Sequence, residues 1–181
     1  PNSRMMFPVP SPDGRSFAYI DLTNLSLRVH DIAAGTSRQV VQQVGNVGTK
    51  PSWSPNGRKI ALAEFQRSNS RYREGRNLIR IVDVASGQAT LLEPGTFPDA
   101  LSERLEAGPA WSPDGRSLAY LMNSTLHVLP VTAEGVPTGP TRQVTGGTAD
   151  MPTWSGGSRT ILYLSDGRLR TVQVGGNRGR D

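Results

Sequence analysis

One short motif recurs four times along this 181-residue chain, and that recurrence limits the possible folds more than any other feature. Residues 51–58 read Pro-Ser-Trp-Ser-Pro-Asn-Gly-Arg, and residues 109–116 repeat them as Pro-Ala-Trp-Ser-Pro-Asp-Gly-Arg. Looser copies occupy residues 8–15 and 152–159. The shared serines of the four copies are 43, 58 and 43 residues apart. The chain is therefore built from a unit of about 43 residues, and the second copy carries 15 additional residues.

The residues that follow each motif also agree from copy to copy, and they have the character of β-strands. Apolar, aromatic and β-branched residues recur there in short runs, which is typical of strands. The Ser-Pro-Asp-Gly segment before them predicts a tight turn, because proline presets φ and glycine accepts a left-handed conformation. One column of equivalent positions holds Phe17, Ile60, Leu118 and Ile161, and a later one holds Leu27, Ile79, Leu126 and Leu169.

Each unit then predicts four antiparallel strands, and such a unit repeating every 40 to 45 residues is typical of a β-propeller blade. The 20 glycines and 14 prolines argue against a helical bundle. We therefore predict an all-β fold, a β-propeller of about four four-stranded antiparallel blades in which the last blade lacks one strand. The predicted blades are residues 8–50, 51–108, 109–151 and 152–174, followed by a flexible tail over 175–181.

The turn motif resembles that of the TolB-like β-propeller repeat family, which is related in architecture to WD-type propellers. The Ala-Tyr pair that follows the turn fits the same family, as do the aspartate and glycine pairs Asp31 with Gly35 and Asp83 with Gly87. The resemblance covers residues 8 to about 174. The final unit is most similar to the propeller segment associated with bacterial amidohydrolase-like proteins.

Propellers of this family normally hold six or more blades, so the resemblance implies that the chain is part of a larger ring. The remaining blades are expected in the same precursor or in a partner, because an open arc exposes apolar blade faces to water. Self-association is the second option. The sequence departs from the family pattern mainly in its outer units, as terminal repeats often do. The departures are Pro10, Pro130, Ser158 and Gln173.

The chain offers few groups for catalysis or metal binding. Its two histidines, His30 and His127, lie in predicted strands, and the sequence has no nucleophile elbow, phosphate-binding loop or zinc-binding helix motif. The carboxylates are scattered, and Asp13 and Asp114 fall in turns, where such side chains cap their own backbone. We therefore predict no catalytic residue, no metal and no cofactor for this chain alone.

Charge and hydropathy bear on partners and compartment. The formal net charge of +5 would attract acidic groups, but the aromatic residues are not interleaved with the basic ones, so no nucleic-acid partner is expected. No stretch approaches the roughly 20 apolar residues of a membrane helix, so no membrane insertion is expected. The absence of cysteine leaves both the cytoplasm and an exported, periplasmic location open, and export is slightly favoured.

Two groups of cations are candidate binding residues. One group occupies equivalent positions on the third strand of each unit, where the side chains form an anion-binding column or lie separately along their own blades. The other belongs to the extended hairpin of the second unit, which is either a flexible, solvated loop or a binding loop, since long loops on a β scaffold are where binding usually resides. The column consists of Arg28, Arg80, His127 and Arg170, and the hairpin carries Arg67, Arg71, Tyr72, Arg73 and Arg76.

Two further expectations concern packing. Large rings at one repeated position are expected to pack between neighbouring blades rather than to stack on a ligand. The second insertion lies between Glu93 and Gly108, where residues 99–105 are expected to form one or two helical turns capped by Asp99. This segment is expected either to dock over the channel mouth or onto another domain, or to remain a loop. The expected blade-core rings are Trp53, Trp111, Trp154, Tyr19, Tyr120 and Tyr163.

These observations leave three functions open. The first is a non-catalytic propeller module that scaffolds protein contacts, as the propeller portion of a larger hydrolase-type, amidohydrolase-like protein or assembly. The second is a TolB-like envelope protein that binds a peptide or protein partner in its channel. The third is a propeller that binds an anion or another small molecule.

Overall fold

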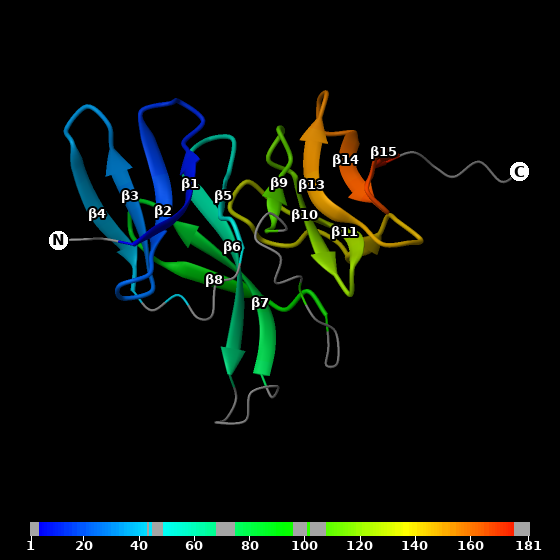
Figure 1. Ribbon diagram of the computed structural model, residues 1–181, viewed down its shortest axis with the longest axis horizontal. Helices are drawn as coiled ribbons and strands as arrows, with labels where there is room; N and C mark the ends of the chain where they lie inside the picture. The colour runs from blue at the N-terminus through cyan, green and yellow to red at the C-terminus, as the bar shows by residue number, and fades with distance from the viewer. Residues whose placement is uncertain are drawn as a thin grey trace, which may run out of the picture.

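The computed structural model describes residues 4–42, 44, 49–67, 75–95, 101 and 108–175. These residues form fifteen β-strands and no helix, which confirms the predicted all-β class. It follows that no helix in this part of the chain is suited to spanning a membrane. The strands make four antiparallel sheets, one for each copy of the motif (Figure 1). The first three sheets have four strands and the fourth has three, as the sequence predicts.

The four sheets are named blades 1 to 4, and their strands follow chain order across each sheet. Blade 1 consists of β1 (Met5–Pro10), β2 (Ser16–Asp21), β3 (Ser26–Asp31) and β4 (Thr36–Val41). Blade 2 consists of β5 (Ser52–Trp53), β6 (Lys59–Arg67), β7 (Gly75–Asp83) and β8 (Ala89–Leu92). Blade 3 consists of β9 (Ala110–Trp111), β10 (Ser117–Met122), β11 (Thr125–Pro130) and β12 (Arg142–Gln143). Blade 4 consists of β13 (Asp150–Ser155), β14 (Thr160–Ser165) and β15 (Arg168–Gln173).

The repeated motif builds the turn between the first and second strands. In blade 1 the Ser11 hydroxyl donates to the Asp13 carboxylate over 2.6 Å and accepts the Ser16 backbone N–H over 3.0 Å. Gly14 follows at φ 70°, in the left-handed region that favours glycine. The same serine bonds are made in blade 2 by Ser54 and Asn56 and in blade 3 by Ser112 and Asp114.

Neighbouring blades pack face to face. Alternate residues of a strand point to opposite sides of its sheet, so each blade has a forward face toward the next blade and a rear face toward the previous one. Three hydrophobic clusters result, joining blades 1 and 2, blades 2 and 3, and blades 3 and 4. The forward faces are Ala18, Ile20, Leu27 and Val29 in blade 1, Ala61, Ala63, Ile79 and Ile81 in blade 2, and Ala119, Leu121, Leu126 and Val128 in blade 3. The rear faces are Ile60, Leu62 and Val82 in blade 2, Leu118, Tyr120 and Leu129 in blade 3, and Ile161, Tyr163 and Val172 in blade 4.

Two of the three junctions also carry a hydrogen bond from a tryptophan. The Trp53 indole N–H donates to the Val9 carbonyl of blade 1 over 3.0 Å, and the Trp154 indole N–H donates to the Ala110 carbonyl of blade 3 over 3.0 Å. Trp111 is the equivalent residue of the middle junction, but its Nε1 is buried and has no hydrogen-bond partner in the described structure. The middle junction therefore lacks the bond that its two neighbours share.

The blades form an open arc. Figure 1 shows blade 1 at one end and blade 4 at the other. Within the described residues, no hydrophobic cluster joins blade 4 back to blade 1. One forward face, on blade 4, and one rear face, on blade 1, are therefore left without a neighbouring blade.

The 15 additional residues of the second unit lie at two places. β6 and β7 each have nine residues, and their hairpin extends away from the other blades (Figure 1). The predicted helical turns over 99–105 lie outside the described residues except for Leu101. Leu101 is buried and forms an antiparallel β-bridge with Met122 of blade 3, so this position is not helical. All but the first residue of the predicted tail, 175–181, also lie outside the described residues.

The unequal junctions give a prediction about the indole N–H groups. Benzothienylalanine has nearly the shape of tryptophan but carries sulfur in place of N–H. At position 53 it should lower the free energy of unfolding by about 1 kcal/mol, because a hydrogen bond between blades is lost. At position 111 it should leave the stability unchanged or raise it, because a buried donor without a partner is removed. Urea unfolding of the two proteins measures the difference, and an equal loss at both positions would contradict the assignment.

Candidate functional site

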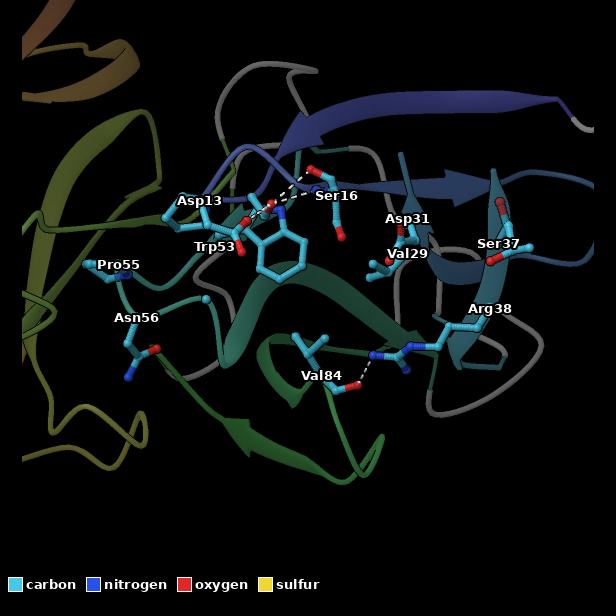
Figure 2. Close-up of a pocket in the computed structure, with 14 residues that line it drawn as sticks. Asp13, Ser16, Val29, Asp31, Ser37, Arg38, Trp53, Pro55, Asn56 and Val84 are labelled. Carbon is cyan, nitrogen blue, oxygen red and sulfur yellow. Dashed lines mark hydrogen bonds between the residues drawn. The ribbon is translucent and has the colours of Figure 1, made fainter. Parts of the chain in front are cut away.

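A pocket of about 660 Å³ lies at the junction between blades 1 and 2, beside the repeated turns. Figure 2 shows its walls, with Asp13 and Asn56 toward one end and Asp31 and Arg38 toward the other. The Trp53 ring lies between them and is half-buried. We call this space the junction pocket. Residues of both blades line it, and its charged side chains, Asp13, Asp31 and Arg38, all belong to blade 1.

The polar groups of the junction pocket are held mainly by the backbone. Asp13 accepts the Ser11 hydroxyl and the Arg15 backbone N–H, and these bonds hold the pKa of its carboxyl below the usual range. Asp31 accepts the Ala34 backbone N–H over 2.8 Å. Hydrogen bonds within the turns of blade 1 therefore hold the two carboxylates of the pocket in place.

Arg38 closes one rim of the junction pocket. Its Nη2 donates to the Val84 carbonyl of blade 2 over 2.6 Å, as the dashed line in Figure 2 shows. This bond ties the outer strand β4 to the following blade. Together with the two carboxylates, Arg38 gives the lining a net single negative charge.

The corresponding place between blades 2 and 3 is filled by a side chain. The Lys59 ammonium lies 3.1 Å from Asp83 Oδ2 and 3.0 Å from Glu134 Oε2, and the Lys59 side chain is only 15% exposed. Glu134 belongs to the turn before Gly135, which packs so closely on blade 2 that a Cβ there would lie 2.5 Å from the Ile81 side chain. The ion pairs therefore tie blade 2 to the β11–β12 turn of blade 3.

A second hollow, of about 620 Å³, lies along the innermost strands β5, β9 and β13 and the end of β1. We call it the inner groove. All three tryptophans line it, and proline dominates the rest of its wall. Apolar and aromatic lining with few charges suits an extended peptide better than a small ion. Its prolines are Pro10, Pro12, Pro51, Pro55, Pro109, Pro113 and Pro152.

The four cations predicted to be equivalent do share one register position. Arg28, Arg80, His127 and Arg170 each pair across the sheet with the residue of the second strand that points to the rear face. They lie on four different blades, each among its own neighbours. The structure therefore places them along separate blade faces and does not bring them together.

The partners of these cations differ. Arg80 forms a two-pronged ion pair with the buried Glu64 carboxylate, one bond measuring 2.8 Å. Arg28 donates to the Tyr19 hydroxyl and to the Ser37 carbonyl, each over 3.2 Å.

In blade 3, His127 stacks on Tyr120 with ring centroids 5.7 Å apart, and its Nε2 lies 2.9 Å from the Thr125 hydroxyl. Arg170 is exposed on blade 4. Among the four cations, the arginine on blade 4 is the most open to solvent.

Two of the predicted hairpin residues lie in described strands. Arg67 and Arg76 belong to β6 and β7, while Arg71, Tyr72 and Arg73 lie outside the described residues, as do the side chains of the first two. Elsewhere in the described structure, no three histidine or acidic side chains gather in a way that could hold a metal ion. His30 and His127 lie on blades 1 and 3.

The tyrosines predicted for the blade core occupy equivalent rear-face positions. Tyr19 and Tyr120 are buried, and Tyr163 is half-buried against the cluster between blades 3 and 4. Trp111 is buried, whereas Trp53 and Trp154 are half-buried and line the inner groove on one side. The tyrosines therefore serve packing, whereas the tryptophans serve both packing and the wall of the inner groove.

Sequence reasoning missed the ion-paired Lys59 and the pocket beside Ser16. The signal was present, because Ser16, Lys59, Ser117 and Thr160 are equivalent positions and only one of them is charged. Whether Lys59 is ion-paired depends on where the next blade places Glu134, and the repeat pattern does not specify that placement.

The chain was compared with known proteins. No family model matches its sequence. Dipeptidyl-peptidase 5 of Porphyromonas gingivalis is 25% identical over 157 residues, which cover 80% of this chain and 21% of that protein. The Tol-Pal system protein TolB of Alcanivorax borkumensis is 36% identical over 64 residues, which cover 34% of this chain and 14% of that protein. The chain thus spans about a fifth or less of the length of these relatives.

Solved structures agree on the architecture. A prolyl endopeptidase matches 96% of this chain and 26% of its own, with a TM-score of 0.68 and 16% sequence identity. A putative TolB from Agrobacterium tumefaciens matches 94% of this chain and 58% of its own, with a TM-score of 0.62 and 17% identity. At these identities the likeness concerns the fold, and it establishes a β-propeller of the kind found in TolB and in peptidase propeller domains.

The Lys59 link gives a prediction about pH. Hydrogen bonds from Ser86 and the nearby Lys59 ammonium hold the pKa of Asp83 well below its usual range. A lowered pKa in the folded state stabilises the protein above the unfolded-state pKa of 3.8, and this stability is lost as the pH falls further. Urea unfolding at pH 7, 5 and 3 should therefore show a smaller acid-induced loss for Asp83→Asn than for the unmodified protein. Equal losses would contradict the role given to this carboxylate.

Proposed function

We propose that this chain is a non-catalytic propeller module that scaffolds protein contacts, as the propeller portion of a larger hydrolase-type protein or assembly. The observation that carries the proposal is the pair of open end faces on blades 1 and 4. Each has the apolar pattern that is covered at every internal junction. Surfaces of that kind are normally buried against a partner.

The forward face of blade 4 is the clearest case. Leu169 occupies the position that Leu27, Ile79 and Leu126 hold in the other blades, where each is fully buried under the next blade. Leu169 is 68% exposed. Leu162 and Leu164 extend the same face and are half-buried. This surface therefore has the apolar composition of a blade junction but no following blade to cover it.

The rear face of blade 1 complements it. Ile32 donates its backbone N–H to the Arg15 carbonyl, as Val84 and Val131 do to the equivalent arginines of blades 2 and 3. Those valines pack on the preceding blade or lie buried, whereas Ile32 is 55% exposed. Phe17 is half-buried on the same face, beside Tyr19, which is already buried within blade 1. Further propeller blades, a hydrolase domain or a second copy of the chain are the partners such faces suit.

The inner groove supports a second candidate function, the binding of a peptide or protein partner along the propeller axis. Its tryptophan and proline lining is the observation that favours it. The likeness to TolB, which is named as a component of the Tol-Pal system, makes an envelope protein of that type the matching expectation.

The proposal predicts that the open faces drive association. Leu169→Asn should reduce self-association, or binding to added propeller sequence, measured by light scattering and sedimentation. It should barely change the melting temperature, because the side chain is already exposed. Val136→Asn is the matched control, since Val136 is 52% exposed on the β11–β12 turn, away from both end faces. A monomer whose behaviour is the same with and without Leu169→Asn, and which binds no partner, would overturn the proposal.

A further inference from the structure

The junction pocket lies where, one junction further along, a lysine side chain is bound. Ser16 of blade 1 and Lys59 of blade 2 are equivalent residues, and each pairs across the sheet with an aspartate, Asp31 or Asp83. Both pairs point to the forward face, because they are in phase with the buried alanines of their strands. The junction between blades 2 and 3 therefore has the long cationic side chain of Lys59 at this position, and the junction between blades 1 and 2 has the small hydroxyl of Ser16.

The surroundings of Lys59 show what this position recognises. Its ammonium is held between the Asp83 carboxylate of its own blade and the Glu134 carboxylate of the next blade, at 3.1 and 3.0 Å. These carboxylates raise the pKa of Lys59, Glu134 contributing most. One junction of this protein thus already binds an alkylammonium group, that of Lys59.

The junction pocket retains the acidic half of that arrangement. Asp31 lines it at the position of Asp83, and Asp13 supplies a second carboxylate to the same cavity. Asp31 accepts one hydrogen bond, from the Ala34 backbone, and forms no ion pair with any described residue. The cation in the lining, Arg38, is held at the rim by the Val84 carbonyl. The Asp31 carboxylate is therefore exposed and has no cationic partner among the described residues.

The remaining walls suit the stem of a lysine. Trp53 and Val29 line the cavity between the two carboxylates, and a hydrocarbon chain ending in an ammonium packs well on such surfaces (Figure 2). The face of an indole also attracts a cation directly. The volume of about 660 Å³ exceeds what one lysine side chain needs, so a peptide backbone can reach the rim.

We propose that the junction pocket binds the side chain of a lysine presented by another protein, with Asp31 as the counter-ion and Trp53 as the apolar wall. This inference goes beyond the proposed function, because it concerns a surface separate from the end faces. A free lysine derivative tests it without any knowledge of the partner, so its failure would leave the end-face proposal standing.

The first test supplies the missing lysine within the chain. Ser16→Lys should place an ammonium beside Asp31, as Lys59 does beside Asp83, and raise the melting temperature by about 2 to 4 °C. The gain should disappear in the double variant Ser16→Lys with Asp31→Asn. Ser117→Lys is the matched control, since the equivalent position in blade 3 pairs with Pro130 and has no carboxylate opposite. A gain that survives Asp31→Asn, or no gain at all, would overturn the inference.

The second test measures binding directly. Titration calorimetry with Nα-acetyl-lysine amide should show binding to the unmodified protein, while the neutral isostere Nα-acetyl-norleucine amide should not bind. Asp31→Asn should weaken binding about tenfold, because a charge-assisted contact is lost. Ser16→Lys should abolish it by filling the pocket. Equal binding of the two probes, no binding of the lysine probe, or binding indifferent to Asp31→Asn would each refute the proposal.

Discussion

Each of blades 1 to 3 buries its forward face under the rear face of the next blade, and repeats of this kind depend on contact with their neighbours for stability. The alternation of small and large side chains makes the contact close. Ala18 and Ala61 lie at equivalent forward positions, and bulky residues such as Ile60 and Leu118 face them from the following blade. The hydrogen-bonded turns determine how the strands pair within each sheet. The packing of one face on the next holds the four sheets together.

Both hollows described here are consequences of this stacking. The inner groove exists because the innermost strands converge with their tryptophans on one side. The junction pocket exists because one residue on a forward face is too short to fill the space that Lys59 fills in the next junction. Recognition in such a fold can therefore change by single substitutions at junctions, while the sheets remain intact.

The sequence predicts the blades well because the decisive interactions are local and repeated. Ser11, Asp13 and Gly14 form a turn from neighbours within a few residues, and the same letters recur at Ser112, Asp114 and Gly115. The Arg80 and Glu64 pair, the unpartnered Trp111 indole and the junction pocket were not predictable in the same way. They depend on how neighbouring strands and blades are placed, to within an ångström, and on exceptions to the repeat rather than on the repeat itself.

The middle junction differs from its neighbours in the kind of force that closes it. The outer two junctions each add an indole-to-carbonyl hydrogen bond to their apolar contact, whereas the middle one adds the ion pair between Lys59 of blade 2 and Glu134 of blade 3. Dissolved salt screens partly exposed ion pairs over about 8 to 10 Å at ordinary ionic strength and has little effect on hydrogen bonds between neutral groups. The arc therefore has a seam at its centre that includes an ion pair, so dissolved salt loosens this seam more than the seam between blades 3 and 4.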